Sequence, residues 1–381
     1  MGYRYFKEEH EIFRKQVRDF CEKELAPHHE EWEEAGLFPR WVFEKAGELG
    51  FLGIRCPEQY GGSNCEYWYT VVWAEELPRC QSAGVALSLM VQTDMATPAI
   101  VAHGTEEQKQ EFLVPAIQGK KIGAICVTEP GAGSDVAAIR STAKKDGDYY
   151  IINGSKTFIT NGTRADWLTL AVKTRPEKGY SGVSLFLFPT TTPGFTVTRK
   201  LHKLGQRSSD TAELAFEDCK LHKKYLLGEE NKGFYYIMEG FQYERLVGAV
   251  SGLAGAKLVF EQTLKFCKER TVFGKPVSSH QANAHQFVNF ATELEAAQAL
   301  VYHCCDMLNR GENAIKEVSM CKLYVGELAV RLVDFCLQMH GGYGYIEEYP
   351  VCRAYRDTKL ITIGGGSSQV MREIIARMMQ L

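Results

Sequence analysis

The spacing of apolar residues divides the chain into three parts. In residues 3–120, apolar positions recur every three to four residues, as Phe13, Val17 and Phe20 do, and this pattern stops before Pro27. A repeat of three to four residues is typical of amphipathic helices that end before a proline. A capping box, in which Thr105 precedes Gln108 by three positions, marks a further helix start. We therefore expect a helical N-terminal domain over residues 1–120.

Residues 121–230 have a different residue pattern, with short runs of β-branched and aromatic residues. Three dipeptides interrupt these runs: Asp146-Gly147, Asn153-Gly154 and Asn161-Gly162. Such pairs are strong signals for the tight turns of β-hairpins. We predict a compact, barrel-like β domain, with the "NGS" and "NGT" sequences acting as turns.

Helical periodicity returns after residue 231, and it predicts long helices over residues 233–270, 280–310 and 314–340. We expect residues 231–381 to form a four-helix bundle. The order helices, strands, helices is that of an α+β protein, since it lacks the βαβ alternation of a parallel nucleotide-binding sheet.

Composition and charge argue against several classes of function. The chain has 381 residues, of which 45% are hydrophobic and 24% charged, and its net charge is −3. This charge gives no reason to expect nucleic acid as a partner. No run of about 18 apolar residues predicts a membrane span, and the charged start "MGYRYFKEEHEIFRKQ" lacks the apolar core of a signal peptide.

The twelve cysteines and ten histidines show no ligand spacing. No pair of cysteines forms a CxxC motif, and His280 and His285 are five positions apart. We interpret the cysteines as reduced, mostly buried thiols. A metal site is not expected.

The stretch "AICVTEPGAGSD", residues 124–135, is the first that suggests chemistry. An apolar strand runs into a loop of small residues, whose exposed N–H groups can surround an anion or the edge of a ring. The stretch is neither a dinucleotide fingerprint, because position 136 is Val, nor a P-loop, because no Gly-Lys-Ser/Thr follows. A plain turn between strands explains it equally well.

Glu244 stands next to a long uncharged segment, residues 246–256, that is rich in Gly and Ala. Small residues let neighbouring backbones approach closely, so this helix is expected to be buried. A carboxylate at the edge of such a region has a raised pKa and becomes a better proton acceptor. The alternative is a surface carboxylate, paired with Arg245, at the start of a helix.

Two further stretches could bind anions. "ERTVFGKPVSSHQ" carries Arg270, whose guanidinium can grip a phosphate, although ordinary helix termination also explains this stretch. "TIGGGSSQ", residues 362–369, leads into the last helix, where Ser367 or Ser368 can serve as the N-cap.

Taken together, these stretches resemble the acyl-CoA dehydrogenase family over essentially the whole chain. "VTEPGAGSD" and "QMHGGYGY…EYPV…YRD" are similar to the two signature segments of that family. Other stretches, such as "RKLHKLGQRSSDTAELAFEDCKL", are most similar to its long-chain branch, and the glycines before the last helix resemble both the long-chain and the isovaleryl-CoA branches.

The resemblance implies FAD-dependent α,β-dehydrogenation of a saturated acyl-CoA to the trans-2-enoyl-CoA. A carboxylate removes the α-proton, and the β-hydrogen leaves as hydride to flavin N5. Many members place this carboxylate just before the last helix, where this chain has Gly365. The long-chain and isovaleryl branches place it on the long helix of the third domain, at the position of Glu244. By this resemblance Glu244 is the catalytic base, and the amide of Gly365 hydrogen-bonds the thioester oxygen.

The remaining site residues follow from the same resemblance. Gly364 leaves room beside the β-carbon for a branched or wider acyl chain. The expected CoA and thioester contacts are Ser134, Tyr235, Gln242, Tyr243, Arg245, Gly364, Gly365 and Gly366. The expected FAD contacts are Val127, Thr128, Gly133, Ser134, Phe158, Ile159, Thr160, Arg270, Phe273, Gln281, Gln338, Gly341, Gly342, Ser367 and Gln369, with Gln338–Gly342 coming from a neighbouring subunit.

A shared FAD site implies at least a dimer, and the family is usually a tetramer built as a dimer of dimers. Electrons would pass to electron-transfer flavoprotein. The expected location is the mitochondrial matrix for a eukaryotic source and the cytoplasm otherwise. The acyl chain itself stays open between long and branched types.

Three alternatives stay open within this resemblance. The first is an oxidase or monooxygenase, but acyl-CoA oxidases are usually longer and monooxygenase relatives generally lack the base. The second is a non-catalytic scaffold, which Gly365 would suit and Glu244 argues against. The third is a decarboxylating glutaryl-CoA dehydrogenase, which needs an Arg around residues 85–87, where this chain reads Val-Ala-Leu.

Overall fold

Helices make up the first part of the chain in the computed structural model, which describes residues 5–381. The predicted start of the helical pattern at residue 3, and the first residues of the charged N-terminus, lie outside the described range. The α-helices are α1 (Glu8–Asp19), α2 (His29–Ala35), α3 (Trp41–Glu48), α4 (Tyr67–Glu76), α5 (Ala83–Met90), α6 (Pro98–His103), α7 (Glu106–Gln108) and α8 (Val114–Ile117). Short 3-10 helices η2 (Ala26–His28), η3 (Phe51–Gly53), η4 (Glu58–Tyr60) and η5 (Leu77–Cys80) connect them.

Three segments between these helices are wound as π-helices: η1 (Phe20–Leu25), η6 (Val91–Ala96) and η7 (Lys109–Leu113). η1 continues α1 as far as Leu25, but the winding does not stop before Pro27 as predicted, because the 3-10 helix η2 (Ala26–His28) contains Pro27 and leads directly into α2. The predicted capping box is confirmed, since the hydroxyl of Thr105 accepts from the backbone N–H of Gln108 and the Gln108 side chain accepts in return.

One helical stretch, Ala83–His103, is long and apolar enough to cross a bilayer by length and composition alone. Most of it is buried inside the fold, however. A buried core helix passes the same test, so this stretch is weak evidence for a membrane span.

The middle of the chain forms one eight-stranded sheet with the order β6-β7-β3-β2-β4-β5-β8, and β1 pairs with β4. Among the described strands the order starts at β6 and ends at β8, so the hydrogen bonding of the barrel-like domain leaves it open. The strands are β1 (Gly123–Cys126), β2 (Thr142–Asp146), β3 (Tyr149–Thr160), β4 (Trp167–Lys173), β5 (Val183–Pro189), β6 (Phe195–Lys200), β7 (Thr211–His222) and β8 (Leu226–Leu227), with 3-10 helices η8 (Val136–Ala138), η9 (Pro176–Gly182) and η10 (Lys223–Tyr225) between them.

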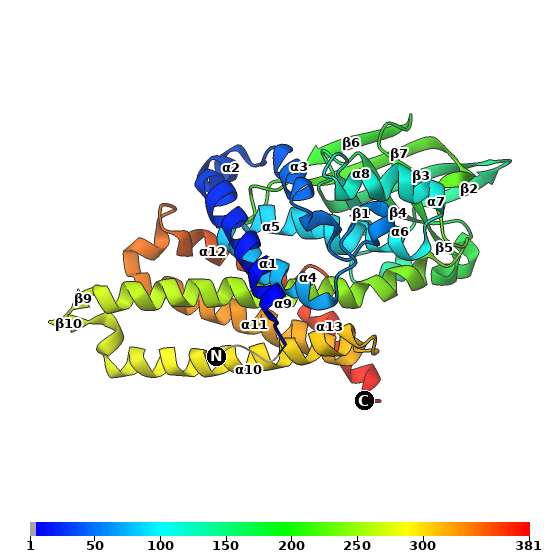
Figure 1. Cartoon of the computed structure of the whole chain (residues 1–381). Coiled ribbons are helices and arrows are strands. Elements are labelled where there is room, and N and C mark those ends of the chain that lie inside the picture. The colour runs from blue at the N-terminus through cyan, green and yellow to red at the C-terminus, as the bar shows by residue number, and fades with distance from the viewer. Residues whose placement is uncertain (1–4) are drawn as a thin grey trace.

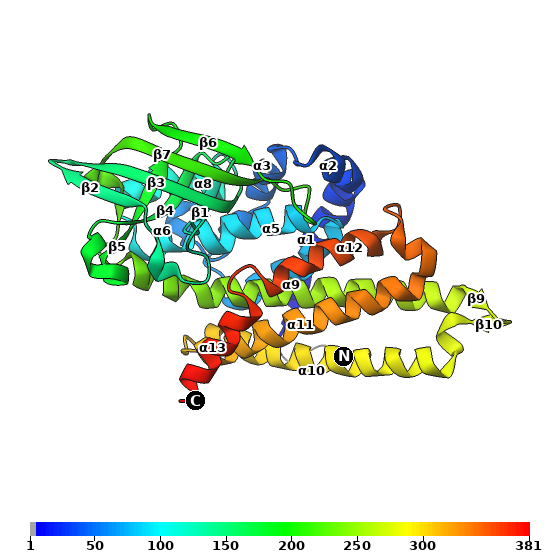
Figure 2. The same ribbon diagram turned by 180° about the vertical axis from the view of Figure 1, so that it is seen from behind.

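Strands β4 and β5 are apolar on both faces because both faces are covered. On one face, Trp167 and Leu185 pack with residues of the N-terminal helices such as Phe112. On the other face, Leu168 and Phe186 belong to a second core inside the β domain. Figures 1 and 2 show α2 and α3 beside the sheet, and α9 passing below these helices and below the sheet.

Two of the three predicted turns are confirmed, and the third is wrong. Gly147 turns the β2–β3 hairpin, and Asn161-Gly162 turns the chain after β3. Asn153-Gly154, in contrast, lies inside β3, where the pairing with β7 is irregular and Gly154 has a φ of 147°. A Cβ at Gly154 would come within 2.2 Å of the Ser141 hydroxyl oxygen. The glycine therefore serves a bulge and a close contact rather than a hairpin.

Long helices dominate the C-terminal part, and their predicted limits are confirmed to within one residue at each end. In Figure 1 the longest of them, α9, extends from beneath the β domain to the opposite end of the molecule. The elements are α9 (Gly233–Glu269), β9 (Thr271–Val272), β10 (Lys275–Pro276), η11 (Val277–Ser279), α10 (Gln281–Asn309), α11 (Ile315–His340), η12 (Gly341–Tyr345), α12 (Pro350–Thr358), η13 (Lys359–Thr362) and α13 (Ser368–Met378).

The cysteines behave as the sequence analysis predicts. All twelve are free thiols, and ten of them are buried. Burial raises the pKa of the Cys126 thiol to about 12, so this side chain behaves as a small apolar core residue.

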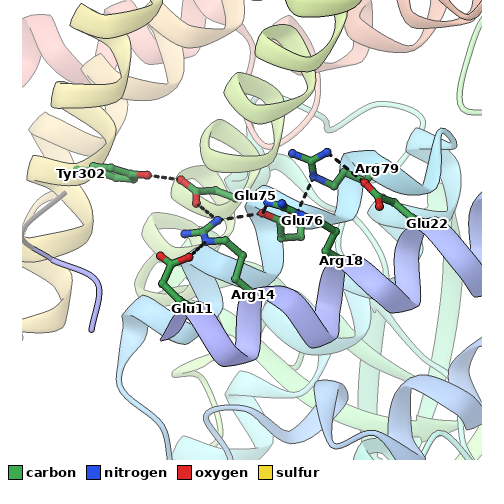
Figure 3. A network of polar contacts seen from close by, with 8 residues as sticks. All are labelled: Glu11, Arg14, Arg18, Glu22, Glu75, Glu76, Arg79 and Tyr302. Carbon is green, nitrogen blue, oxygen red and sulfur yellow. Dashed lines mark hydrogen bonds and ion pairs between the residues drawn. The ribbon is translucent and has the colours of Figure 1, made fainter. Parts of the chain in front are cut away.

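A network of charged side chains ties α1 and α10 to the end of α4 (Figure 3). At its centre Glu76, only 3% exposed, accepts hydrogen bonds from Arg14, Arg18 and Arg79 at 2.7–3.0 Å. The neighbouring Glu75 accepts from Arg14 and from the Tyr302 hydroxyl. Burial alone would raise the pKa of Glu76, but hydrogen bonds from Arg18 and Arg14 and the charges of Arg18 and Arg79 outweigh burial and lower it.

Candidate active site

A cavity of about 250 Å³ lies between α9, the segment η6–α6 and strands β1, β4 and β5. α9 contributes Tyr236, Ile237, Phe241, Tyr243 and Glu244 to its wall, while the strands contribute apolar or small side chains. The cavity therefore joins all three parts of the chain at one place, and the predicted base faces it.

Glu244 lies inside α9, which begins at Gly233, so the alternative of a surface carboxylate at a helix start is wrong. The residue as a whole is half-buried, but its carboxyl group is removed from solvent. Burial raises the pKa of Glu244 to about 7, and the nearby charges of Arg245 and Lys322 oppose that rise. A carboxylate with such a pKa can take up a proton at neutral pH and release it again.

Glu244 lies beside the glycine loop that precedes the last helix. A Cβ added at Gly365 would be 3.4 Å from Oε1 of Glu244. The two positions, 121 residues apart in sequence, thus meet at one point in the fold. Gly365 and Gly366 have φ values of 62° and 99°, a left-handed conformation that favours glycine.

Two cations hold this loop in place. Arg245 is 9% exposed, and its Nε donates to the carbonyl oxygen of Gly365 at 3.1 Å. Lys322 of α11, 4% exposed, donates to the carbonyl oxygen of Gly366. In the described part of the chain the N–H of Gly365 makes no hydrogen bond, so it is available to a ligand.

The sequence analysis missed Lys322, although the sequence contains a signal for it. Val318, Lys322, Val325 and Ala329 follow the helical spacing of a buried stripe, and the other three are apolar core residues. A charged residue in a core stripe needs a partner. Burial and the charge of Arg245 lower the pKa of Lys322 to about 8, while Glu244 opposes this change.

Replacing Lys322 with Met is expected to move the acid limb of the pH profile of kcat/KM upward from about pH 7. The Lys322 cation favours the carboxylate form of Glu244, so its removal raises the pKa of Glu244 further. In Lys322→Arg the cation is kept, and the limb should stay near its wild-type position. An unchanged limb in Lys322→Met would contradict an influence of Lys322 on the base.

The loop after β1 is tied to β3, which brings two groups of predicted contacts together. Lys156 donates to the carbonyl oxygen of Val127 at 2.8 Å, and the N–H of Thr157 donates to that of Thr128 at 3.0 Å. Lys156 is 1% exposed and forms an ion pair with Glu129 at 2.9 Å. The sequence analysis did not single out this buried pair, which fixes the start of the "TEPGAGSD" loop.

Phe158 lies near the end of β3, where the pairing with β7 is irregular, and it is an unusual side chain. It is 67% exposed and has a φ of 59°, while its neighbour Ile159 is buried. A large apolar ring that the fold holds outward in a strained conformation suggests a contact surface. In the loop after β1, Gly133 has open space where a Cβ would be.

Arg270 and the end of α11 meet in a second hollow of about 510 Å³. Its wall includes Arg270, Gln338, Gly341 and Gly342. Phe273, on the β9–β10 hairpin, is 97% exposed, and Gln281 is exposed at the start of α10. The structure therefore brings Arg270 together with Gln338–Gly342 of the same chain.

The other predicted contacts lie along α9 and at the start of α13. Tyr235 is 49% exposed, and Gln242 has a buried Oε1 without a hydrogen-bond partner among the described residues. Ser367 is the N-cap of α13, since its hydroxyl accepts from the N–H of Val370, and Gln369 is exposed. At Gly364, a Cβ would make only ordinary contacts with Leu360, so there is room at this position.

Sequence profiles of one family match nearly the whole chain. The N-terminal domain of acyl-CoA dehydrogenase matches residues 7–120, the middle domain residues 124–219 and the C-terminal domain residues 231–380. The chain belongs to the acyl-CoA dehydrogenase family. It is 42% identical to the mitochondrial long-chain specific acyl-CoA dehydrogenase of Sus scrofa, over 98% of this chain and 87% of that protein.

Two further relatives illustrate the range of the acyl-CoA dehydrogenase family. The crystal structure of an acyl-CoA dehydrogenase from Geobacillus kaustophilus superposes with a TM-score of 0.96 at 45% identity, over 100% of both chains. The Caffeyl-CoA reductase-Etf complex subunit CarC of Acetobacterium woodii is 40% identical over 98% of this chain and 99% of that protein.

Acyl-CoA dehydrogenases are FAD-dependent oxidoreductases, and this chain offers a fitting site. Phe158 presents an exposed ring beside the loop of Val127 and Thr128, as an isoalloxazine contact requires. Arg270 places a guanidinium in the wall of the second hollow, and such a group can grip a phosphate. Within one subunit these two groups lie far apart, because the start of α9 packs on the β domain and Arg270 follows the last residue of this long helix.

Proposed function

We propose that this acyl-CoA dehydrogenase oxidises a saturated long-chain or branched-chain acyl-CoA to the trans-2-enoyl-CoA, with Glu244 as the base that removes the α-proton. The observation that carries this proposal is the position of Glu244. Its carboxylate lines the cavity, lies beside Gly365 and has a pKa near 7. Glu244 therefore brings a carboxylate to the place in the fold where many members of the family have one at the position of Gly365.

Removal of an α-proton also requires stabilisation of the negative charge that develops on the thioester oxygen. The unpaired N–H of Gly365 can donate to that oxygen. Arg245 and Lys322 bind the carbonyl groups of Gly365 and Gly366, and they thereby hold the loop that carries this N–H group. The role of the two cations is positional, because both already donate to the loop.

Bound FAD supplies the two-electron acceptor for the β-hydrogen. Val127, Thr128, Phe158 and the Gly133–Ser134 loop would hold the ring beside the cavity, since Val127 lines the cavity wall. Burial of the carboxyl group and the apolar lining exclude water from the reacting carbons. Exclusion of water strengthens the hydrogen bonds to the thioester oxygen.

The site needs a second copy of this chain. α9 has 37 residues and is therefore about 55 Å long. Its first residue, Gly233, packs on the backbone of β5, whereas Arg270 follows its last residue. One FAD cannot reach both ends within one subunit. We therefore propose that Arg270 and Gln338–Gly342 complete the FAD site of a partner subunit, in a tetramer built as a dimer of dimers.

The reverse reaction, reduction of an enoyl-CoA, is the second candidate. The relative from Acetobacterium woodii is named a reductase, and a group with a pKa near 7 donates a proton as readily as it accepts one. The same relative is named as part of an Etf complex, which supports electron-transfer flavoprotein as the redox partner in either direction. The mitochondrial relative from Sus scrofa supports a matrix location for a eukaryotic source.

An anaerobic titration of the yellow holoenzyme with saturated straight and branched acyl-CoAs tests the proposed direction. We expect the flavin absorbance to be lost when the amount of added acyl-CoA approaches that of the enzyme. A protein that stays oxidised with every saturated acyl-CoA, but is reoxidised by enoyl-CoA after chemical reduction, would support the reductase instead. A protein that responds to neither would overturn both candidates.

A further inference from the structure

The N–H group of Gly365 lies in the peptide unit that joins Gly365 to Gly364. Arg245 and Lys322 hold the loop after this unit, at the carbonyl groups of Gly365 and Gly366. The place of the N–H also depends on the chain before Gly364, because a planar peptide unit is fixed at both of its ends. That preceding chain consists of α12 and η13.

The chain from α12 to the glycine loop is continuously wound. η13 begins at Lys359, directly after α12 ends at Thr358. The N–H groups of Ile363 and Gly364 both donate to the carbonyl oxygen of Leu360 at 2.9 Å. A shift of the end of α12 is therefore passed on to Gly364 rather than absorbed by a flexible linker.

The end of α12 is fixed to residues 201–210, which we call the β6–β7 loop. The carboxylate of Asp357 accepts a hydrogen bond from the backbone N–H of Gln206, and the Gln206 amide donates to the carbonyl oxygen of Asp357 at 3.4 Å. A Cβ added at Gly205 would lie 2.5 Å from the carbonyl group of Arg356. The two backbones are therefore in direct contact, and a larger residue at Gly205 would push them apart.

The β6–β7 loop is fixed in turn to the N-terminal domain. The N–H of Ser208 donates to Glu33 at 3.0 Å, and its carbonyl oxygen accepts from the N–H of Phe38 at 2.9 Å. The hydroxyl groups of Ser208 and Ser82 are 2.5 Å apart. Through these contacts Asp357 connects α12, and with it the glycine loop, to both other domains.

Asp357 acts at a distance from the reacting atoms, since it is not part of the cavity wall. It is 5% exposed. Burial and the charge of Glu33 raise the pKa of Asp357 to about 6, while the N–H of Gln206 and the charges of Arg353 and Arg356 oppose this rise. Removal of the Asp357 acceptor leaves the N–H of Gln206 without that partner, which loosens the contact between α12 and the β6–β7 loop.

We propose that Asp357 is a positioning residue for the reaction: it fixes the end of α12 to the β6–β7 loop and thereby sets the place of the Gly365 N–H beside the thioester oxygen. This inference rests on the proposed function, because it assumes that this N–H stabilises the enolate that forms when Glu244 removes the α-proton.

The test uses 3-thiadecanoyl-CoA on the holoenzyme. Sulfur replaces the β-carbon in this analogue, so the analogue can give up its α-proton but cannot deliver a β-hydride, and the enolate accumulates. The long-wavelength absorbance of the enolate beside oxidised flavin measures its amount at equilibrium. Asp357→Leu should lower the equilibrium constant for enolate formation about 10- to 100-fold, as expected for a misplaced contact. With a saturated acyl-CoA, kcat should fall similarly and KM should change less.

Gly205→Ala gives an independent readout, because it removes no hydrogen bond. The added Cβ meets the backbone of Arg356 and displaces α12, so the enolate should again decrease. This variant decides the question if Asp357→Leu does not fold. Asp357→Asn keeps an oxygen that accepts from Gln206, and it should retain most of the enolate.

Glu347→Gln is the matched control at the same contact. Glu347 pairs with Arg356 but is 65% exposed, so its replacement should leave the enolate unchanged. Wild-type amounts of enolate in Gly205→Ala and in folded Asp357→Leu would overturn the inference. A wild-type holoenzyme that forms no enolate, and whose flavin responds to no acyl-CoA or enoyl-CoA, would instead overturn the proposed function.

Discussion

Glu244→Gln is expected to lower the rate of flavin reduction by acyl-CoA about 10²- to 10⁴-fold, the usual contribution of a positioned general base. The amide keeps the shape of the side chain but cannot take the α-proton. FAD should stay bound, because none of the predicted FAD contacts is altered. Stopped-flow measurement of flavin bleaching under anaerobic conditions reports the chemical step directly.

Glu261→Gln is a suitable control for that experiment. Glu261 lies on the same helix, is exposed, and is not part of the cavity wall. Its replacement should leave flavin reduction unchanged. A near-normal rate in Glu244→Gln would show that another group removes the proton, and the proposed mechanism would then fail.

Glu76→Gln is expected to lower the free energy of unfolding by about 3–5 kcal/mol, as is typical when one partner of a buried ion pair is removed. The amide leaves Arg14, Arg18 and Arg79 without their shared counter-charge. Urea unfolding of the holoenzyme measures the loss. Glu11→Gln is the matched control: Glu11 also pairs with Arg14 but is 58% exposed, so a change of about 0–1 kcal/mol is expected.

The same network predicts how stability depends on pH. The pKa of Glu76 is lower in the folded protein than its ordinary value of 4.5. The stabilisation is therefore fully present above the unfolded pKa and is lost as the pH falls through the folded pKa. Wild type should lose stability on acidification below about pH 4.5 more steeply than Glu76→Gln. Parallel curves for the two proteins would contradict a charged Glu76 in the folded state.

Apolar periodicity was sufficient to predict the long helices, because α9, α10 and α11 each bury a regular stripe. It was not sufficient at Asn153-Gly154. There the local signal for a turn is strong, but the pairing of β3 with β7 continues past it with a bulge. Cross-strand pairing between distant segments decides the outcome at such a position, and a local pattern cannot contain that information.

The candidate site, like the fold, could be predicted only in part from the sequence. The fold brings the predicted residues Glu244 and Gly365 together, and it gathers Arg270 with Gln338–Gly342. The roles of these residues stay predictions until variants are measured. Lys322 interrupts a buried stripe, which signals that it needs a partner, but the groups that act on it, Arg245 and Glu244, lie on another helix and a local pattern cannot identify them.

The π-helical winding of η6 has a consequence for the cavity. A π-helical turn contains about one residue more than an α-helical turn, so it offsets the helix after it by about 100°. α5 is packed into the core on one side of η6, while α6 lines the cavity on the other. Deleting one residue between Val91 and Ala96 would restore α-helical phase, and Asp94 or Pro98–His103 would rotate away from the cavity. The phase of this single turn thus sets which side chains line the cavity.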